Sequence, residues 1–187
     1  VAWVRESSQH KVKYNLTHEL FAAVGVRDVS AVDALLERGA DPNSLQDGAE
    51  RTPLLEAIES NYTDVVKVML QRGADPNAEG AYGSSPLVEA ARGGHQAILH
   101  LLLAHGAELG DLTGLLKVAA SSGNASLVTD VITLGAEPAA NLGVFGTALH
   151  GAGSAKVAKT LVDAGCPVDG RDGRGRTALH TAAQEGD

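Results

Sequence analysis

The sequence predicts an all-α fold, a row of repeated units that each hold two helices. A start signal of the form Thr/Ser-Pro/Ala-Leu recurs along the chain, and a Gly follows the apolar stretch that closes each unit. Aromatic residues make up only 3% of the 187 residues, although 44% are hydrophobic. A core of Ala, Leu and Val therefore has to fill the interior, and small side chains let helices pack closely.

The start signals are evenly spaced, which is the mark of a repeat protein. The steps between successive starts are 34, 33, 29, 33 and 30 residues, with full signals at Thr52, Ser85, Thr147 and Thr177 and weaker ones at His18 and Gly114. Five units and a sixth that contains only its first helix are expected over residues 18–187. Residues 1–17 are a lead-in that either caps the first unit or belongs to a preceding repeat.

Within a unit, each element has a local cause. Thr52 can cap a helix N-terminus by accepting a backbone N–H, and Pro53 suits the first helical position because its missing donor would be unpaired there. The second helix shows apolar pairs at helical spacing, as in Val65-Val66 and Met69-Leu70. Gly73 can adopt the left-handed conformation that ends a helix. A turn-rich loop then leads to the next unit.

These motifs resemble those of ankyrin repeats. The resemblance covers about residues 18–187, and several of its motif positions recur in phase. It implies stacked helix-turn-helix units joined by short hairpin-like loops, with first helices and loop tips lining a concave face that binds other proteins. It is carried by Thr52-Pro53-Leu54 with Ala57, Gly39-Ala40-Asp41-Pro42-Asn43, Gly73-Ala74-Asp75-Pro76-Asn77, and Thr177-Ala178-Leu179-His180-Thr181-Ala182-Ala183.

The chain departs from the family pattern at three places. The His that follows the Leu of the motif survives only at His150 and His180, and Lys117 is one of its replacements. The loop from Glu108 to Thr113 is four residues shorter than the others, so we expect a stunted projection there. The fifth unit lacks three residues near Gly151 and Gly153, which predicts a weakened first helix.

Charge is distributed unevenly. The chain has a formal net charge of −8, which argues against nucleic acid as the main partner. Residues 28–111 carry 14 acidic and 5 basic residues, a net of −9, so the remainder is close to neutral. An acidic surface favours a partner protein with a basic surface. Three arginines, Arg171, Arg174 and Arg176, lie in the last connecting loop.

Seven residues are candidates for partner binding. Glu56, Glu59, Glu89 and Arg92 occupy variable polar positions of two first helices, where the alternative is a solvated face that keeps the protein soluble. Tyr82 is at a loop tip and suits an interface hot spot, unless it folds back on its own loop. The remaining two, Asp47 and Glu50, belong to an extended loop.

No residue pattern indicates catalysis. His95, His100 and His105 are spaced five apart, which places them on different faces of a helix, so we expect no metal site. Cys166 is the only cysteine and is expected to be a small packing residue. A Gly-x-Ser-x-Gly nucleophile motif is missing. We expect a non-catalytic protein without cofactor or small-molecule substrate.

The functional expectation is a protein–protein interaction scaffold, with a regulatory or substrate-recruiting arm of a larger multidomain enzyme or signalling protein as the alternative. The sequence begins with Val1 and shows no secretory signal pattern. Its apolar runs fall well short of the ~18 residues of a membrane span. We therefore expect part of a longer cytoplasmic or nuclear protein, monomeric and without a membrane association.

Overall fold

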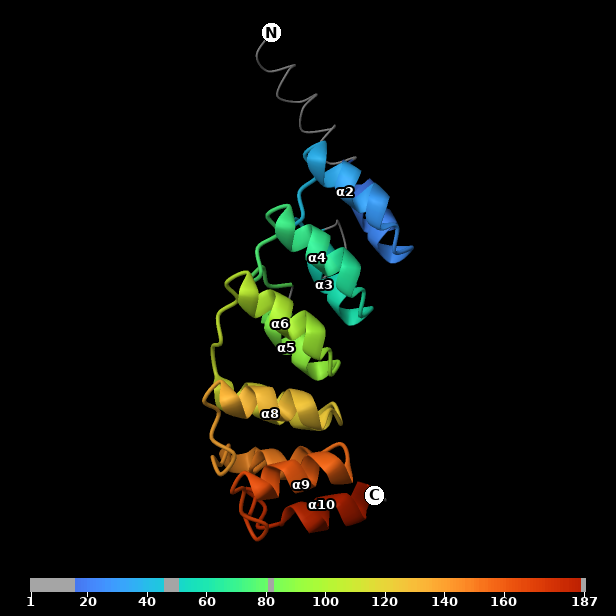
Figure 1. The fold of residues 1–187 in the computed structure, drawn as a ribbon. Coiled ribbons are helices and arrows are strands. Elements are labelled where there is room, and N and C mark those ends of the chain that lie inside the picture. Colours follow the sequence, from blue (N-terminus) through green and yellow to red (C-terminus); the bar gives the residue numbers. More distant parts are fainter. Residues whose placement is uncertain (1–15, 46–50, 81–82, 186–187) are drawn as a thin grey trace. The chain divides into compact units, whose positions relative to one another are not determined.

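A computed structural model describes residues 16–45, 51–80 and 83–185, and the regular secondary structure of these residues is entirely helical, without a β-strand (Figure 1). This confirms the predicted all-α class. A first helix covers residues 16–25, and it is followed by α2 (Val29–Glu37), α3 (Pro53–Glu59), α4 (Thr63–Gln71), α5 (Pro86–Arg92), α6 (Gln96–Ala104), α7 (Leu112–Ser121), α8 (Ala125–Thr133), α9 (Ala155–Asp163) and α10 (Ala178–Glu185), with short 3-10 helices η2 (Gly143–Phe145) and η3 (Ala148–Gly151).

The chain divides into two compact bodies. The N-terminal body comprises Val1–Ala90 and Ala97–Glu108, and the C-terminal body comprises Ala91–Gln96 and Leu109–Asp187. Within the described residues, no helix is both long enough and apolar enough to cross a membrane.

In the N-terminal body, α3 forms as its sequence predicts. The Thr52 hydroxyl accepts a hydrogen bond from the Leu55 N–H at 3.3 Å, and Pro53 occupies the first turn. The amphipathic helix α4 packs against both α3 and α2 and buries Val65, Val66, Met69 and Leu70. No helix of this kind could bury its apolar face alone, so packing between neighbouring units supplies the core.

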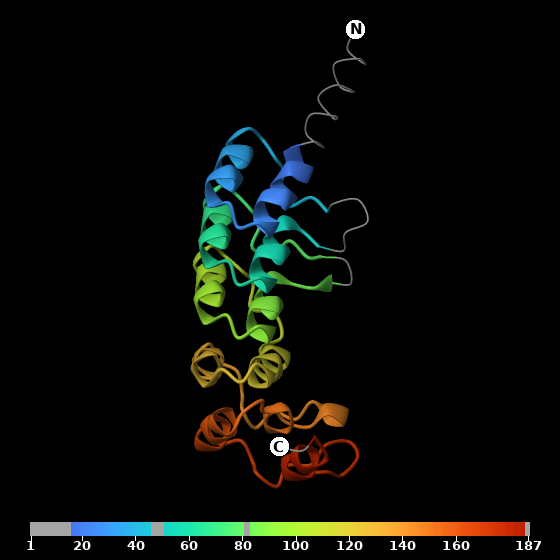
Figure 2. The same cartoon turned by 90° about the vertical axis from the view of Figure 1, so that its right-hand side faces the viewer.

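In the C-terminal body, α8 packs against α7 and α9, so second helices lie side by side (Figure 2). A second line of contacts runs from α7 through η3 to α10. Leu116, Leu127 and Leu161 are fully buried between these elements. The sequence therefore places first helices in one layer and second helices in another within this body.

The connecting loops are closed by backbone hydrogen bonds and linked by asparagine side chains. The Leu142 N–H donates to the Gly146 carbonyl at 2.9 Å, closing one hairpin-like loop. In the N-terminal body, the Asn77 amide oxygen accepts from the Glu108 N–H at 2.8 Å, and its amide nitrogen donates to the Gly106 carbonyl at 3.3 Å. Such bonds satisfy loop groups that have no helical partner.

The shortened loop before the fourth unit differs from expectation. The start signal predicts a helix after Gly114, but α7 begins at Leu112. Asp111 caps it, because its carboxylate accepts a hydrogen bond from the Thr113 N–H at 3.0 Å. The residues that would form a projecting loop are instead taken up by an additional helical turn.

The fifth unit shows the consequence of its deletion. Its first helix is the four-residue 3-10 segment η3 rather than an α-helix. The Gly153 N–H donates to the Ala120 carbonyl at 2.9 Å, and a Cβ at Gly153 would lie 2.5 Å from the Ser121 carbonyl oxygen. Gly153 thus permits a close approach of backbone to the end of α7, a role that the sequence does not reveal.

Candidate functional site

The acidic residues of α3 are the predicted partner-binding residues that the structure describes best. Five of the seven residues of α3 are buried, and the two others are Glu56 and Glu59. Arg51 forms an ion pair with Glu59 and lies 4.0 Å from Glu56. The sequence did not anticipate this arginine, which offsets part of the acidic charge.

The other predicted contacts fall on α5 and on two loops. Glu89 is in the first turn of α5 and Arg92 in its last turn. Tyr82, Asp47 and Glu50 lie outside the described residues. The structure therefore places four of the seven candidates on two first helices, and their contact with a partner stays a prediction.

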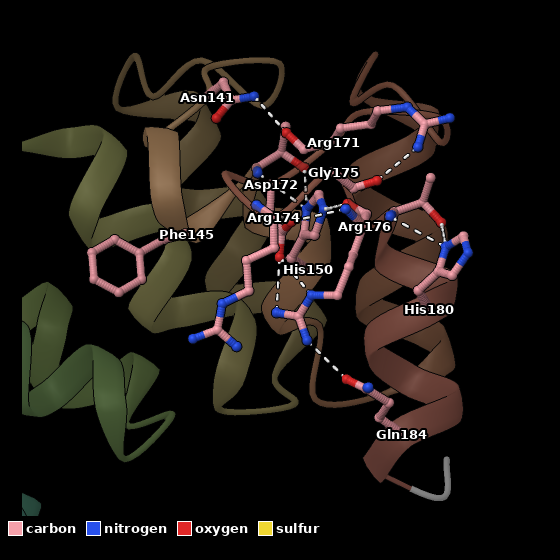
Figure 3. Close-up of polar contacts among 12 residues, drawn as sticks. Asn141, Phe145, His150, Arg171, Asp172, Arg174, Gly175, Arg176, His180 and Gln184 are labelled. Atoms are coloured by element: carbon pink, nitrogen blue, oxygen red, sulfur yellow. Dashed lines mark hydrogen bonds and ion pairs between the residues drawn. The ribbon is translucent and has the colours of Figure 1, made fainter.

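In the C-terminal body, His150 joins the fifth unit to the sixth (Figure 3). The Thr147 N–H donates to His150 Nδ1 at 3.1 Å, so Nδ1 is the acceptor and Nε2 carries the hydrogen. His150 Nε2 then donates to the Arg176 carbonyl at 3.1 Å. His180 repeats the local contact, with its Nδ1 2.7 Å from the Thr177 hydroxyl.

Asp172 organises the last connecting loop. Its side chain is only 3% exposed and accepts hydrogen bonds from the Arg174 and Arg176 N–H groups, each at 2.9 Å. The Arg176 guanidinium donates to the other carboxylate oxygen at 2.9 Å. The hydrogen bond from the Arg176 N–H, with those from the Arg176 side chain and the Arg174 N–H, lowers the pKa of Asp172 to about 2, against the opposing effect of burial.

Lys117 holds the tip of the preceding loop. Its ammonium donates a hydrogen bond to the Phe145 carbonyl at 2.9 Å and lies 4.4 Å from the centre of the Phe145 ring. Burial lowers the pKa of Lys117. The sequence showed that Lys replaces the family's His here, but not that a loop 28 residues further along would receive it.

An apolar groove of about 570 Å³ lies between η3, α9 and α10 in the C-terminal body. Leu179, at its edge, is 78% exposed. Its lining contains one hydroxyl, that of Ser154, and no titratable side chain. An active site would need converging titratable groups, which this groove does not offer.

Candidate metal ligands do not converge in the part of the chain that the structure describes, where no group of three or more His, Cys, Asp or Glu side chains could hold an ion. The thiol residue Cys166 is buried. It follows the helix-ending Gly165 as the buried residues Ala40 and Ala74 follow their own glycines.

Comparison with known proteins agrees with this architecture. Residues 20–112 match the family model of ankyrin repeats (3 copies). Over 94 residues the chain is 39% identical to zygote-specific protein 3 of Chlamydomonas reinhardtii, and this match spans 49% of the chain and 24% of that protein. The chain thus spans about a quarter of the length of this curated relative.

Solved structures extend the similarity beyond the matched segment. The human ASB11 ankyrin repeat domain superposes with a TM-score of 0.72 at 30% identity, covering 86% of this chain and 74% of that one. The ankyrin repeat domain of Bcl-3, a member of the IkappaB protein family, has a TM-score of 0.69 at 24% identity, covering 90% and 80%, and shows the shared fold. The recurring motifs, the two-layer helix packing and these similarities together show that the chain belongs to the ankyrin-repeat family.

Proposed function

We propose that this ankyrin-repeat protein is a non-catalytic scaffold that binds a partner protein with a basic surface along its first helices, on the concave face. Ankyrin repeats are generally protein–protein interaction modules. The observation that carries the proposal is on α3, where every residue outside the core is a glutamate. The part of the helix that solvent reaches therefore presents carboxylates.

The pairing of Arg51 with Glu56 and Glu59 fits this role. Surface ion pairs contribute little to stability, typically about 0–1 kcal/mol, because solvent screens them. A basic residue of a partner can therefore share or displace Arg51 at low cost. Complementary charge of this kind mainly raises the association rate and fixes the orientation of the partner.

The alternative is that the repeats form the regulatory or substrate-recruiting arm of a larger multidomain enzyme or signalling protein. The chain spans only 24% of the Chlamydomonas relative, and a repeat domain can belong to a larger protein of this kind. Both versions place the binding in the same residues, and for both we propose a cytoplasmic protein, with the nucleus as the other location.

Affinity purification with the full-length protein, followed by measurement of the purified partner's affinity, tests the proposal. The triple variant Glu56→Ala, Glu59→Ala and Glu89→Ala should bind roughly tenfold more weakly, since a loss of about 0.5 kcal/mol from each of three charged contacts amounts to about tenfold in affinity. A matched control removes three carboxylates of the C-terminal body, Glu137, Asp163 and Asp169. Equal affinity of the triple variant and the control would refute binding through the acidic helices.

A further inference from the structure

The two connecting loops of the C-terminal body pack tightly against each other. A Cβ at Gly173 would lie 2.7 Å from the Val144 Cα, so the second loop, residues 169–176, touches the backbone of the first loop, residues 137–146. The Asn141 amide nitrogen also donates to the Arg171 carbonyl at 3.0 Å. Phe145 follows Val144 in the sequence, and Arg174 follows Gly173. The tips of the two loops therefore lie next to each other (Figure 3).

The second loop is fixed from within. Asp172 accepts two backbone hydrogen bonds from the residues that follow it, and its own N–H donates to the Arg176 carbonyl at 2.9 Å. Arg176 connects this loop to α10 through Gln184, at 2.8 Å. A loop ordered before binding loses little conformational entropy when a partner arrives.

Large apolar side chains are exposed on the first loop. Val144 is 67% exposed and Phe145 is 66% exposed. Lys117 anchors the Phe145 carbonyl and lies over its ring, which fixes the position of the aromatic side chain. An exposed and rigid aromatic residue is typical of an interface hot spot.

The two loops carry both signs of charge, because the exposed carboxylates Glu137 and Asp169 are their first residues, but the charged group that lies against Phe145 is the ammonium of Lys117. The Arg171 guanidinium donates to the Gly175 carbonyl at 2.7 Å and lies on the opposite side of the second loop from Phe145 (Figure 3). The Arg174 guanidinium has no hydrogen-bonding or ionic partner among the described residues, and it is drawn without a contact in Figure 3. The carboxylate of Asp172 lies within this loop, but it is buried and paired with Arg176.

We propose that the cationic loop surface, formed by Val144, Phe145, Arg174 and Lys117, docks an acidic protein segment that carries a large apolar side chain. The apolar side chain packs against Phe145 and Val144, and a carboxylate of the segment pairs with Arg174. Arg binds carboxylates through two parallel N–H groups, which gives the contact direction as well as strength. This surface shares with the proposed function only the premise of protein binding, because it uses none of the same residues and selects the opposite charge.

A peptide fits this surface better than a nucleic acid does. The two loops contain a single aromatic residue, Phe145, whereas single-stranded nucleic acids bind to series of aromatic platforms along a basic groove. The formal net charge of −8 on the whole chain also disfavours binding of a long polyanion such as a nucleic acid, because like charges repel. A short acidic segment meets the local positive charge without approaching the rest of the chain.

The test uses a fluorescent synthetic peptide of Glu and Asp residues with a central Leu-Trp pair, titrated with the protein at low salt and followed by anisotropy. Saturable binding is expected, and both Phe145→Ala and Arg174→Glu should weaken it about tenfold or more. Lys156→Glu is the matched control, because this exposed lysine makes the same change in net charge near the start of α9, whereas Arg174 lies in the loop that follows the end of α9. The control should stay within about twofold of the parent.

Two further arms separate the outcomes. A basic peptide with the same Leu-Trp pair should not bind, and single-stranded RNA that bound as tightly as the acidic peptide would overturn the proposal. Undiminished peptide binding by Arg174→Glu, or an equal loss in Lys156→Glu, would overturn it as well. The Glu56, Glu59 and Glu89 triple variant should bind the acidic peptide normally, so failure of the acidic helices and failure of the loop surface are distinguishable. Because both substituted residues are exposed, circular dichroism should show unchanged helix content.

Discussion

His150 illustrates how one side chain links adjacent repeats. Its Nδ1 accepts from the Thr147 N–H in its own repeat, and its Nε2 donates to the Arg176 carbonyl of the loop before the next one. Neutral imidazole has one acceptor and one donor, and both are used here. His180 uses only the first of these contacts, since among the described residues its Nε2 has no hydrogen-bond partner.

Replacing His150 should therefore loosen α10. His150→Ala removes the bond to Arg176, and the loss of one hydrogen bond, about 0.5–1.5 kcal/mol, should speed amide exchange in residues 178–185 roughly 2- to 12-fold. His150→Asn retains an acceptor for the Thr147 N–H but is too short to reach Arg176. It should protect the Thr147 amide while leaving α10 as exchangeable as the Ala variant does. Unchanged exchange of α10 in both variants would refute the link.

Asp172 should make stability depend on pH in the acid range. Its pKa is about 2 in the folded protein, below the value near 3.9 of an unfolded Asp, so the ionised carboxylate favours folding. This contribution is complete above about pH 4 and disappears as the pH falls towards about 2.

Thermal unfolding measured from about pH 6 to about pH 2 checks this expectation. Asp172→Asn should lower Tm by several degrees near neutral pH, and the difference from the parent should shrink as the pH falls through the window. Asp163→Asn is the control and should change Tm little, because this exposed carboxylate pairs only with Lys159 among the residues that the structure describes. A difference between Asp172→Asn and the parent that is independent of pH would contradict the prediction.

At the scale of elements, the sequence predicts most helices because each start signal has a direct physical meaning. Thr52 and Pro53 act as cap and first-turn residue of α3, as their chemistry requires. The sequence fails at α7, because Asp111 competes with the weak signal at Gly114 and extends the helix towards its N-terminus. The capping residue Asp111, within the shortened loop, sets the N-terminal end of α7. The spacing of the repeat signals alone does not show where this helix begins.

The same limit applies to the loop tips of the candidate site. The acidic positions of α3 follow from the repeat register, so they could be read from the sequence. The contact of Lys117 with Phe145 depends on how a loop folds over a helix, which no local pattern encodes. Gly173 against Val144 is a backbone contact between separate loops and is equally invisible in the sequence.

The fifth repeat yields a prediction about its two glycines. Gly153→Ala should destabilise the protein by about 1–3 kcal/mol, because its Cβ would meet the Ser121 carbonyl oxygen at 2.5 Å and force the backbone of α7 and this turn apart. Gly151→Ala is the matched control, since its Cβ would meet only the flexible Lys117 side chain, 4.0 Å away. It should be neutral or slightly stabilising. Urea denaturation measures the free energy of unfolding of both variants. Equal stability of the two would show that the close contact between Gly153 and the Ser121 carbonyl does not require a glycine.

At the scale of the whole molecule, packing within each body is mostly between elements near in sequence. In the N-terminal body α4 contacts α2 and α3, and in the C-terminal body the contacts run between α7, α8, α9, η3 and α10. Stability in such repeat proteins is approximately a sum of repeat and neighbour terms.

The acidic surplus of residues 28–111 and the cationic loop surface also fall in different parts of the chain, so each binding proposal can be tested with the other surface intact.

This local organisation predicts how a core defect spreads. Leu161 is fully buried in α9, and Leu161→Ala should cost about 2–5 kcal/mol through lost burial and a cavity. Because neighbour terms dominate, amide exchange should accelerate strongly in residues 148–185 and much less in residues 54–70 of the N-terminal body. The reciprocal variant Ile58→Ala, at an equally buried position of α3, should reverse the pattern. Hydrogen exchange followed by mass spectrometry measures both, and an equal acceleration of the two regions in either variant would show that the chain unfolds as one cooperative unit.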